Sequence, residues 1–143
     1  LYLKLMEYKE KTGRPIWAYM ESQCCSGGVY IASSADEQYA NRNTTTGSIG
    51  VIISNYDMTG LYEKLGVKED NIVSAKNKDM GSSGKPMTAE QREIFQSVVN
   101  EAYEQFVEIV ANIIQFGNFL TGSSINSDGY AFAILCKCKY ARL

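Results

Sequence analysis

The chain has 143 residues, of which 45% are apolar, so it can bury a core large enough for one globular domain. Fourteen basic and sixteen acidic residues give a formal charge of −2, which argues against nucleic acid as a partner because a phosphate backbone attracts a strongly basic surface. The sequence contains no histidine, which excludes a Ser-His-Asp triad, a Cys-His pair and most histidine-ligated metal sites within it. Acid–base chemistry therefore falls to Lys, Asp, Glu, Tyr or Cys.

The cysteines and the ends of the chain set further expectations. The pairs Cys24–Cys25 and Cys136–Cys138 lack the spacing of zinc ligands, so we expect free thiols. The sequence begins at Leu1, without a basic-then-apolar leader, and contains no apolar run of about 18 residues that could span a bilayer. We therefore expect an excised or partial segment of a longer protein.

The first 35 residues predict a helix, a strand, a tight turn and a second helix. Residues 1–12 have the spacing of an amphipathic helix that ends at Gly13. The apolar run 16–20 has the length of a strand, and the small residues that follow it at 22–28 predict a tight turn. Residues 29–35 predict a short helix.

Strands and a helix are predicted again between residues 37 and 66. The segment 37–40 predicts a short strand, 41–46 a polar loop, and the β-branched run 49–54 a buried strand. Asp57 is suited to cap a following helix, which Gly66 ends in the left-handed conformation.

The second half of the chain predicts one long helix. Before it, residues 71–74 predict a strand and 77–86 a mobile loop. Thr88 and Gln91 then form a capping-box pattern. Apolar residues recur behind it at the three- and four-residue steps of a core or interface helix, namely Phe95, Val98, Val99, Ala102, Phe106, Ile109, Val110 and Ile113. Strands that alternate with helices predict an α/β fold with a mainly parallel sheet.

The tight turn carries a candidate nucleophile. A serine between a strand and a helix exposes its hydroxyl, and the backbone N–H groups at the helix start can stabilise an oxyanion. Ser26, followed by Gly27 and Gly28, fits this description, and the Gly27 N–H is the natural first oxyanion donor. Without histidine, the serine needs another base. A lysine can serve if its neutral form is stabilised by about 4 to 5 kcal/mol, which requires hydrogen-bond partners for the amine.

Several runs of the sequence, in this order and spacing, together resemble the signal peptide peptidase A family of serine peptidases. The resemblance covers about 110 of the 143 residues. Its runs are Gly13-Arg14-Pro15-Ile16, Cys25-Ser26-Gly27-Gly28-Val29-Tyr30-Ile31-Ala32, Ala35-Asp36, Thr46-Gly47-Ser48-Ile49-Gly50-Val51-Ile52, Lys64-Leu65-Gly66-Val67, Ser74 with Lys78-Asp79, and Met87-Thr88.

The resemblance implies roles for individual residues. The family's Ser-Gly-Gly nucleophile corresponds to Ser26, and its general base, the lysine of a Lys-Asp pair, corresponds to Lys78 and not to Lys76. Ser48, in the Thr-Gly-Ser-x-Gly motif, would donate or accept the hydrogen bond that the lysine amine needs.

The resemblance also implies a fold, a reaction and an assembly. We expect a crotonase- or ClpP-like α/β fold, and hydrolysis of short apolar peptides such as remnant signal peptides through an acyl-enzyme, with no metal and no cofactor. The family implies a homo-oligomer with active sites near protomer interfaces. It also implies attachment to the cell membrane, on its extracytoplasmic face, through a segment absent from this sequence.

The sequence departs from the family at both ends. The upstream Gly-Gly segment that supplies a second oxyanion donor would precede Leu1. We assign residues 1–112 to the peptidase core and 113–143 to a divergent tail, in which Tyr130 stands where the family has an arginine after Asp-Gly.

Three other functions remain open at this point. A crotonase-like acyl-CoA enzyme would share the architecture but would use backbone amides and acidic groups. A non-catalytic assembly module would use the long helix and the sheet without the chemistry. A close relative with the same Ser-Lys pair could instead cut membrane-protein partners or capsid proteins.

Overall fold

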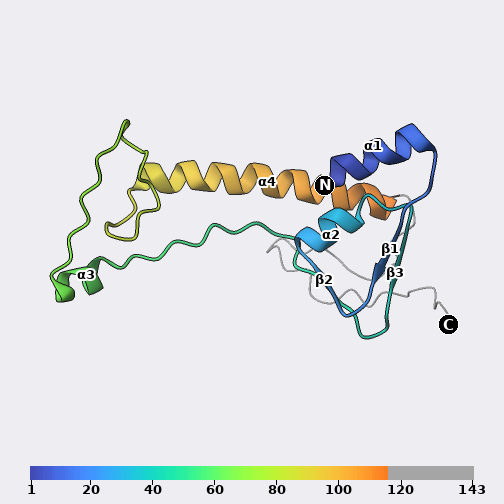
Figure 1. Cartoon of the computed structure of the whole chain (residues 1–143), viewed down its shortest axis with the longest axis horizontal. Coiled ribbons are helices and arrows are strands. Elements are labelled where there is room, and N and C mark those ends of the chain that lie inside the picture. The colour runs from blue at the N-terminus through green and yellow to red at the C-terminus, as the bar shows by residue number, and fades with distance from the viewer. Residues whose placement is uncertain (116–143) are drawn as a thin grey trace. The chain divides into compact units, whose positions relative to one another are not determined.

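The computed structural model describes residues 1–115 (Figure 1). The described residues fall into two compact units: one holds Leu1–Gly50 with residues 103–115, and the other holds Val51–Ala102. The elements in chain order are α1 (Tyr2–Thr12), β1 (Trp17–Met20), β2 (Gln23–Cys25), α2 (Gly27–Ala32), β3 (Glu37–Ala40), β4 (Thr45–Gly47), α3 (Thr59–Leu65) and α4 (Ala89–Gln115).

All strand pairs of the described chain are parallel. In the first pair, β1 lies beside β3 with Trp17 opposite Glu37 and Met20 opposite Ala40. In the second pair, β2 lies beside β4 with Cys25 opposite Gly47. Helix α2 lies between the two members of each pair along the chain, as is usual for the crossover that parallel strands need. The predicted α/β class with mainly parallel pairing is therefore confirmed.

The strands of the second pair lie where the sequence predicted a turn and a loop. Residues 23–25 and 45–47 are short and rich in small or polar side chains, so their pairing depends on a partner about twenty positions away and has no local signal. The side chain of Thr46 reinforces it, because its hydroxyl donates a hydrogen bond to the Cys24 carbonyl at 2.7 Å.

The predictions of strands at 49–54 and 71–74 are wrong. Neither segment forms a strand in the described chain. Ile49 is buried in the core, but Ile52 is 83% exposed and Ile72 is fully exposed. The β-branched residues favour a pleated, half-buried surface, and here no neighbouring strand provides one.

The predicted C-terminal ends of two helices, α1 and α3, are confirmed. Gly13 has a φ of 64° and its N–H donates to the Lys9 carbonyl at 2.8 Å, which closes α1. Gly66 closes α3 with a φ of 69°. The N-cap of α3 is Met58, one residue after the predicted Asp57, although the Asp57 carboxylate accepts a hydrogen bond from the Thr59 N–H at 3.0 Å. The predicted helix at 29–35 is also present, as α2, two residues earlier than expected.

The capping box at the start of α4 is confirmed in both directions. The Thr88 N–H donates to the Gln91 side-chain oxygen and the Gln91 N–H donates to the Thr88 hydroxyl, each at 3.2 Å. The apolar stripe is buried toward the C-terminal end of the helix, where Phe106 and Val110 belong to the core, whereas Val98 is 51% exposed. The side chain of Ile113 and residues 116–143 lie outside the described part of the chain.

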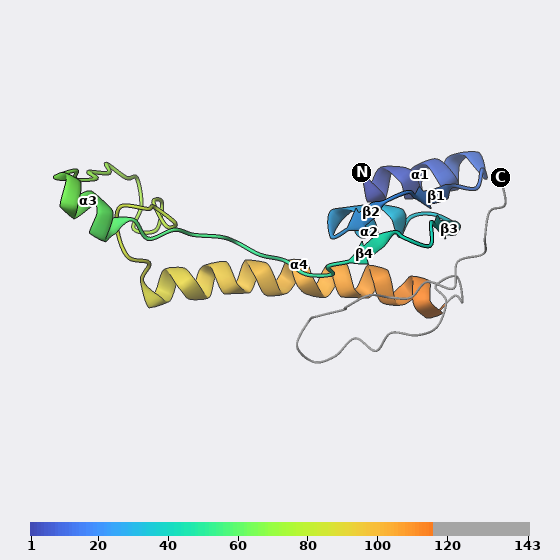
Figure 2. The ribbon, with the colours of Figure 1, turned by 90° about the horizontal axis from the view of Figure 1, so that it is seen from below.

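The core of the first unit lies directly behind α2. Val29, Ile49, Phe106 and Val110 form its buried cluster. Figure 2 shows α2 with α1 on one side and the C-terminal part of α4 on the other. Tyr30 of α2 contacts both neighbours: its ring centroid lies 5.2 Å from that of Phe106 and 5.5 Å from that of Tyr2 in α1. These contacts fix the short helix that follows Ser26.

Candidate active site

Ser26 occupies a strained turn between β2 and α2. Its φ of 51° and ψ of −117° lie in a region that non-glycine residues rarely adopt. Such a conformation costs on the order of 1 to 3 kcal/mol and persists only where the surroundings impose it. Two hydrogen bonds impose it here: the Ser26 N–H donates to the Gly47 carbonyl at 2.8 Å, and the Ser26 carbonyl accepts from the Tyr30 N–H at 3.0 Å.

The Ser26 hydroxyl is not used to hold the turn. Ser26 is the N-cap of α2, yet its side chain makes no capping hydrogen bond. Across residues 1–115 the hydroxyl has no hydrogen-bond partner, and the side chain is half-buried. A strained serine between a strand and a helix, with a hydroxyl that the fold leaves unengaged, is suited to the role of a nucleophile, which needs an adjacent base for its activation.

The two glycines after Ser26 serve different purposes. A Cβ on Gly27 would meet no atom within 4 Å, so the space beside the start of α2 is open to a ligand. A Cβ on Gly28 would lie 3.3 Å from the Cys24 sulfur, so a small residue lets α2 approach β2 closely. The Gly27 N–H has no intrahelical partner, because the first N–H groups of any helix lack one.

Ser48 lies beside Ser26. Cys25 and Gly47 are register partners on parallel strands, so the next residue of each strand, Ser26 and Ser48, emerges at the same edge of the pair. Ser48 also has a positive φ, of 53°, and it is exposed, while Gly47 before it is buried. The structure thus places Ser26, Gly27 and Ser48 at one end of the β2–β4 pair.

Lys78 belongs to the second compact unit and Ser26 to the first. Lys78 is exposed, and its N–H donates to the Ala75 carbonyl at 3.0 Å. Within residues 1–115 its ammonium group has no carboxylate partner, whereas the Lys76 ammonium is paired with Glu90. The pairing of Ser26 with Lys78 stays a prediction.

The carboxylate next to Lys78 was not assigned a role from the sequence. Asp79 forms an ion pair with Lys85, with 2.5 Å between the Lys85 nitrogen and the Asp79 Oδ2 oxygen. The Lys85 ammonium holds the pKa of Asp79 below its ordinary value, and Asn71 adds a hydrogen bond at 3.5 Å. The sequence could have indicated this pair through Asp79 itself. If the adjacent Lys78 is neutral, as predicted, the Asp79 carboxylate needs a different cation as its partner.

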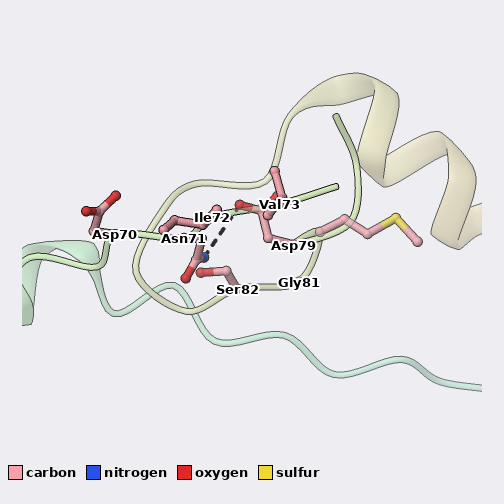
Figure 3. A pocket seen from close by; sticks show the side chains of 8 residues that line it. Asp70, Asn71, Ile72, Val73, Asp79, Gly81 and Ser82 are labelled. Atoms are coloured by element: carbon pink, nitrogen blue, oxygen red, sulfur yellow. Dashed lines mark hydrogen bonds between the residues drawn. The ribbon is translucent and has the colours of Figure 1, made fainter. Parts of the chain in front are cut away.

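An open hollow lies beside the loop that carries Asp79 (Figure 3). Its volume is about 500 Å³, and Figure 3 shows the Asn71 amide pointing to the Asp79 carboxylate within it. The residues that line it are Asp70, Asn71, Ile72, Val73, Asp79, Met80, Gly81 and Ser82.

The cysteine nearest the turn is poorly suited to act as the nucleophile. Burial raises the pKa of the Cys24 thiol, and the neighbouring Cys25 raises it further. A thiol must lose its proton to attack, so the raised pKa makes Cys24 less reactive. Among the described residues, no group of three acidic or cysteine side chains could hold a metal ion. Within the same part of the chain, every helix is too short or too polar to cross a bilayer.

Comparisons with known proteins indicate a peptidase family. Residues 8–116 match peptidase family S49. The chain is 41% identical over 108 residues to the candidate signal peptide peptidase SppA of Enterococcus faecium, which covers 76% of this chain and 31% of that protein. It is 34% identical over 94 residues to the chloroplastic serine protease SPPA of Arabidopsis thaliana, covering 65% of this chain and 14% of that protein. It is 31% identical over 105 residues to protease 4 of Haemophilus influenzae, covering 73% and 17%.

The match covers most of the chain and includes Ser26, Ser48 and Lys78. The chain therefore belongs to peptidase family S49, a family of SppA-type serine peptidases. It spans less than a third of the length of these three relatives.

Proposed function

We propose that this chain carries the catalytic core of a serine endopeptidase that hydrolyses short apolar peptides, such as remnant signal peptides. Ser26 is the nucleophile and Lys78 the general base. The observation that carries the proposal is the strained turn at Ser26, between a strand and a helix. Among the described residues, the Ser26 hydroxyl has no hydrogen-bond partner. The family match supports the same class of reaction.

The first half of the reaction forms an acyl-enzyme. The Ser26 oxygen attacks the carbonyl carbon of the peptide, and its proton passes to the neutral amine of Lys78. The carbonyl oxygen becomes negative and accepts a hydrogen bond from the Gly27 N–H. In enzymes that stabilise an oxyanion in this way, the loss of one such donor typically lowers the rate by a factor of about 10² to 10³. The Lys78 ammonium then donates its proton to the leaving amine, and the C–N bond breaks.

The second half restores the enzyme. A water molecule attacks the ester carbonyl, Lys78 accepts its proton, and the bond to the Ser26 oxygen breaks as that oxygen regains a proton. Lys78 must be neutral at the start of both halves. Ser48 is the proposed hydrogen-bond partner of the Lys78 amine, because it lies next to Ser26 at the strand ends.

The proposal extends to the fold and the assembly. We propose a crotonase- or ClpP-like arrangement, a homo-oligomer in which active sites lie near protomer interfaces, and association of the complete protein with the extracytoplasmic face of the cell membrane. The parallel strand pairs support the α/β part of this proposal. The assembly and the membrane association are proposed from the family resemblance alone. Homo-oligomer formation would also allow Ser26 and Lys78 to come from neighbouring protomers.

The test combines covalent labelling with turnover. The full-length gene product is treated with a fluorophosphonate probe and with a fluorogenic apolar peptide, beside Ser26→Ala, while its oligomer size is recorded. We expect the wild type to be labelled at Ser26 and to cleave the peptide, and Ser26→Ala to do neither. A folded, assembled wild type that is neither labelled nor active would instead favour a non-catalytic assembly module.

A further inference from the structure

A groove in the second compact unit is lined by the first turns of α4, by the residues just before that helix and by the segment that precedes α3. Its volume is about 390 Å³, within the range of about 300 to 1,000 Å³ that is usual for ligand pockets. Its α4 residues are Arg92, Phe95, Gln96 and Val99, which recur at three- and four-residue steps and so share one face of the helix. Every lining residue falls within 51–102, so the groove belongs to one unit.

Much of the groove lining is apolar and partly open to water. Ile53 is 42% exposed, and Met87, Phe95 and Val99 are half-buried. The Phe95 ring lies against Gly81, where an added Cβ would be 3.3 Å from it. Apolar side chains in a concave site are stabilised when an apolar ligand removes them from water. The groove therefore favours an occupant with apolar side chains.

The groove also contains a cation that the described chain does not neutralise. The Arg92 guanidinium forms no ion pair and no side-chain hydrogen bond with any residue of 1–115. Arg92 lies near the N-terminal end of α4, where the helix dipole also favours a negative charge. The acid of the first turn, Glu90, is already engaged by Lys76 and by the Asn77 amide. Because a guanidinium binds a carboxylate through two parallel hydrogen bonds, charge complementarity indicates an occupant with a carboxylate group.

Two further polar side chains of the groove favour a peptide over other apolar carboxylates. The Asn55 amide has no hydrogen-bond partner in the described part of the chain, and it offers both a donor and an acceptor to a peptide group. Hydrogen bonding from Thr59 holds the pKa of Asp57 below its ordinary value, so the Asp57 carboxylate is anionic at neutral pH. Among the described residues, Asp57 takes part in no ion pair, with Arg92 or with any other cation. A fatty acid has an apolar chain and a carboxylate but nothing to bind Asn55 and Asp57.

We infer that this groove binds a short apolar peptide by its free ends, with the terminal carboxylate on the Arg92 guanidinium and the terminal ammonium on the Asp57 carboxylate. The Asn55 amide binds a peptide group between the two ends, and the apolar lining covers the side chains of the peptide. The site requires neither Ser26 nor Lys78, so it goes beyond the proposed function. Where the proposed function holds, the groove retains a short substrate or a released product.

The first experiment measures binding by calorimetry in the full-length gene product with Ser26→Ala, which removes the proposed nucleophile. The probes are trileucine, trileucine amide and decanoate. We expect trileucine to bind with a Kd below about 1 mM, and about tenfold more tightly than its amide. Adding Arg92→Gln should abolish this preference for the acid. Adding Lys68→Gln, which removes an exposed cation of the same unit outside the groove, should preserve it.

The second experiment tests the apolar lining and locates the ligand. Ile53→Ser removes an apolar side chain from the groove, whereas Ile52→Ser changes a neighbour that is 83% exposed and lies outside it. We expect trileucine to bind about three- to tenfold more weakly to Ile53→Ser and equally well to Ile52→Ser. Trileucine carrying a photoactivatable diazirine is then crosslinked to the protein and mapped by mass spectrometry. We expect crosslinks to residues 53–57 and 92–99.

The outcomes separate this site from the proposed active site. Crosslinks confined to the segment around Ser26, or a preference for the acid that survives Arg92→Gln, would overturn the peptide groove. Decanoate that binds as tightly as trileucine would assign the groove to fatty acids and reject the peptide. If Arg92→Gln does not fold, the comparison of Ile53→Ser with Ile52→Ser decides, together with the crosslinks. Crosslinks in the groove of a protein whose Ser26 neither cleaves peptides nor reacts with a fluorophosphonate would support the site and reject the proposed function.

Discussion

Ser26 and Ser48 leave two neighbouring parallel strands with nearly equal positive φ angles, 51° and 53°. One backbone hydrogen bond, from the Ser26 N–H to the Gly47 carbonyl, ties the two turns together. Two non-glycine residues in the left-handed half of the backbone map, side by side, mark the place where the fold accepts strain, and strain of this kind is concentrated at functional sites.

The strain at Ser26 predicts that glycine at this position gives a more stable protein than alanine. Ser26→Gly removes the cost of the positive φ, whereas Ser26→Ala keeps it, and neither variant has a nucleophile. We expect Ser26→Gly to have a free energy of unfolding about 1 kcal/mol higher than that of Ser26→Ala, measured by urea denaturation. Equal stabilities would show that the turn is not strained.

Lys78 and Lys76 should behave differently in turnover. We expect Lys78→Ala to reduce peptide hydrolysis to background, because the base is lost, and Lys76→Ala to retain most of it, because Lys76 pairs with Glu90. The wild-type rate should rise with pH, since the base acts in its neutral form. Full activity in Lys78→Ala would eliminate Lys78 as the base. A wild-type rate of hydrolysis that does not change between about pH 5 and about pH 9 would do the same.

Asp36 should make the stability of the first unit dependent on pH. The Lys9 ammonium, 2.7 Å from the Asp36 carboxylate, and the Ile16 N–H hold the pKa of Asp36 below its ordinary value. A lowered folded-state pKa contributes stability that is present above the unfolded pKa and is lost as the pH falls through the folded value. We expect Asp36→Asn to lower the free energy of unfolding by under about 1 kcal/mol at neutral pH.

That difference should shrink once the pH falls below about 4, the ordinary value for an aspartate, and vanish only below the lowered folded-state pKa, where the wild-type carboxyl is also neutral. Denaturation of both proteins at several pH values checks the prediction. Glu10→Gln, which alters an exposed carboxylate of α1, is the matched control. A deficit in Asp36→Asn that stayed constant down to the lowest pH would assign its effect to packing and not to charge.

The capping box should contribute measurably to α4. Thr88→Ala removes the acceptor of the Gln91 N–H, and we expect it to cost about 1 kcal/mol in the free energy of unfolding. Ser97→Ala, at an exposed position inside the same helix, removes a hydrogen bond to the Ile94 carbonyl but gains helix propensity, so we expect it to be neutral. Thermal unfolding followed by circular dichroism compares them, and equal losses would contradict the capping role.

The nucleophile turn could be predicted from the sequence because small residues between an apolar run and a helix are a local signal. The positive φ of Ser26 could not be predicted, since it arises from hydrogen bonds to Gly47 and Tyr30. The short strands β2 and β4 were missed for a similar reason, because each is defined by its partner. The β-branched run 49–54 gave the opposite error: its composition favours a strand, but the described chain offers it no neighbour.

The role of Lys78 could be proposed from the sequence only through the family resemblance. Its surroundings depend on contacts between side chains that are several positions apart, such as Asp79 with Lys85 and Ser82 with Glu69. Such contacts have no period and no fixed spacing. The ends of helices, in contrast, were predicted well because Gly13, Gly66 and the Thr88–Gln91 pair act on their immediate neighbours.

The cluster that supports the turn joins Val29 to Val110, about 80 positions further along the chain. A contact of such long range forms late, because the intervening chain must first be ordered. During synthesis, Ser26 would emerge long before the helix that fixes α2 behind it. We therefore expect a nascent chain to present an unstructured serine, and its reactivity to appear only when the last turns of α4 have folded against the core.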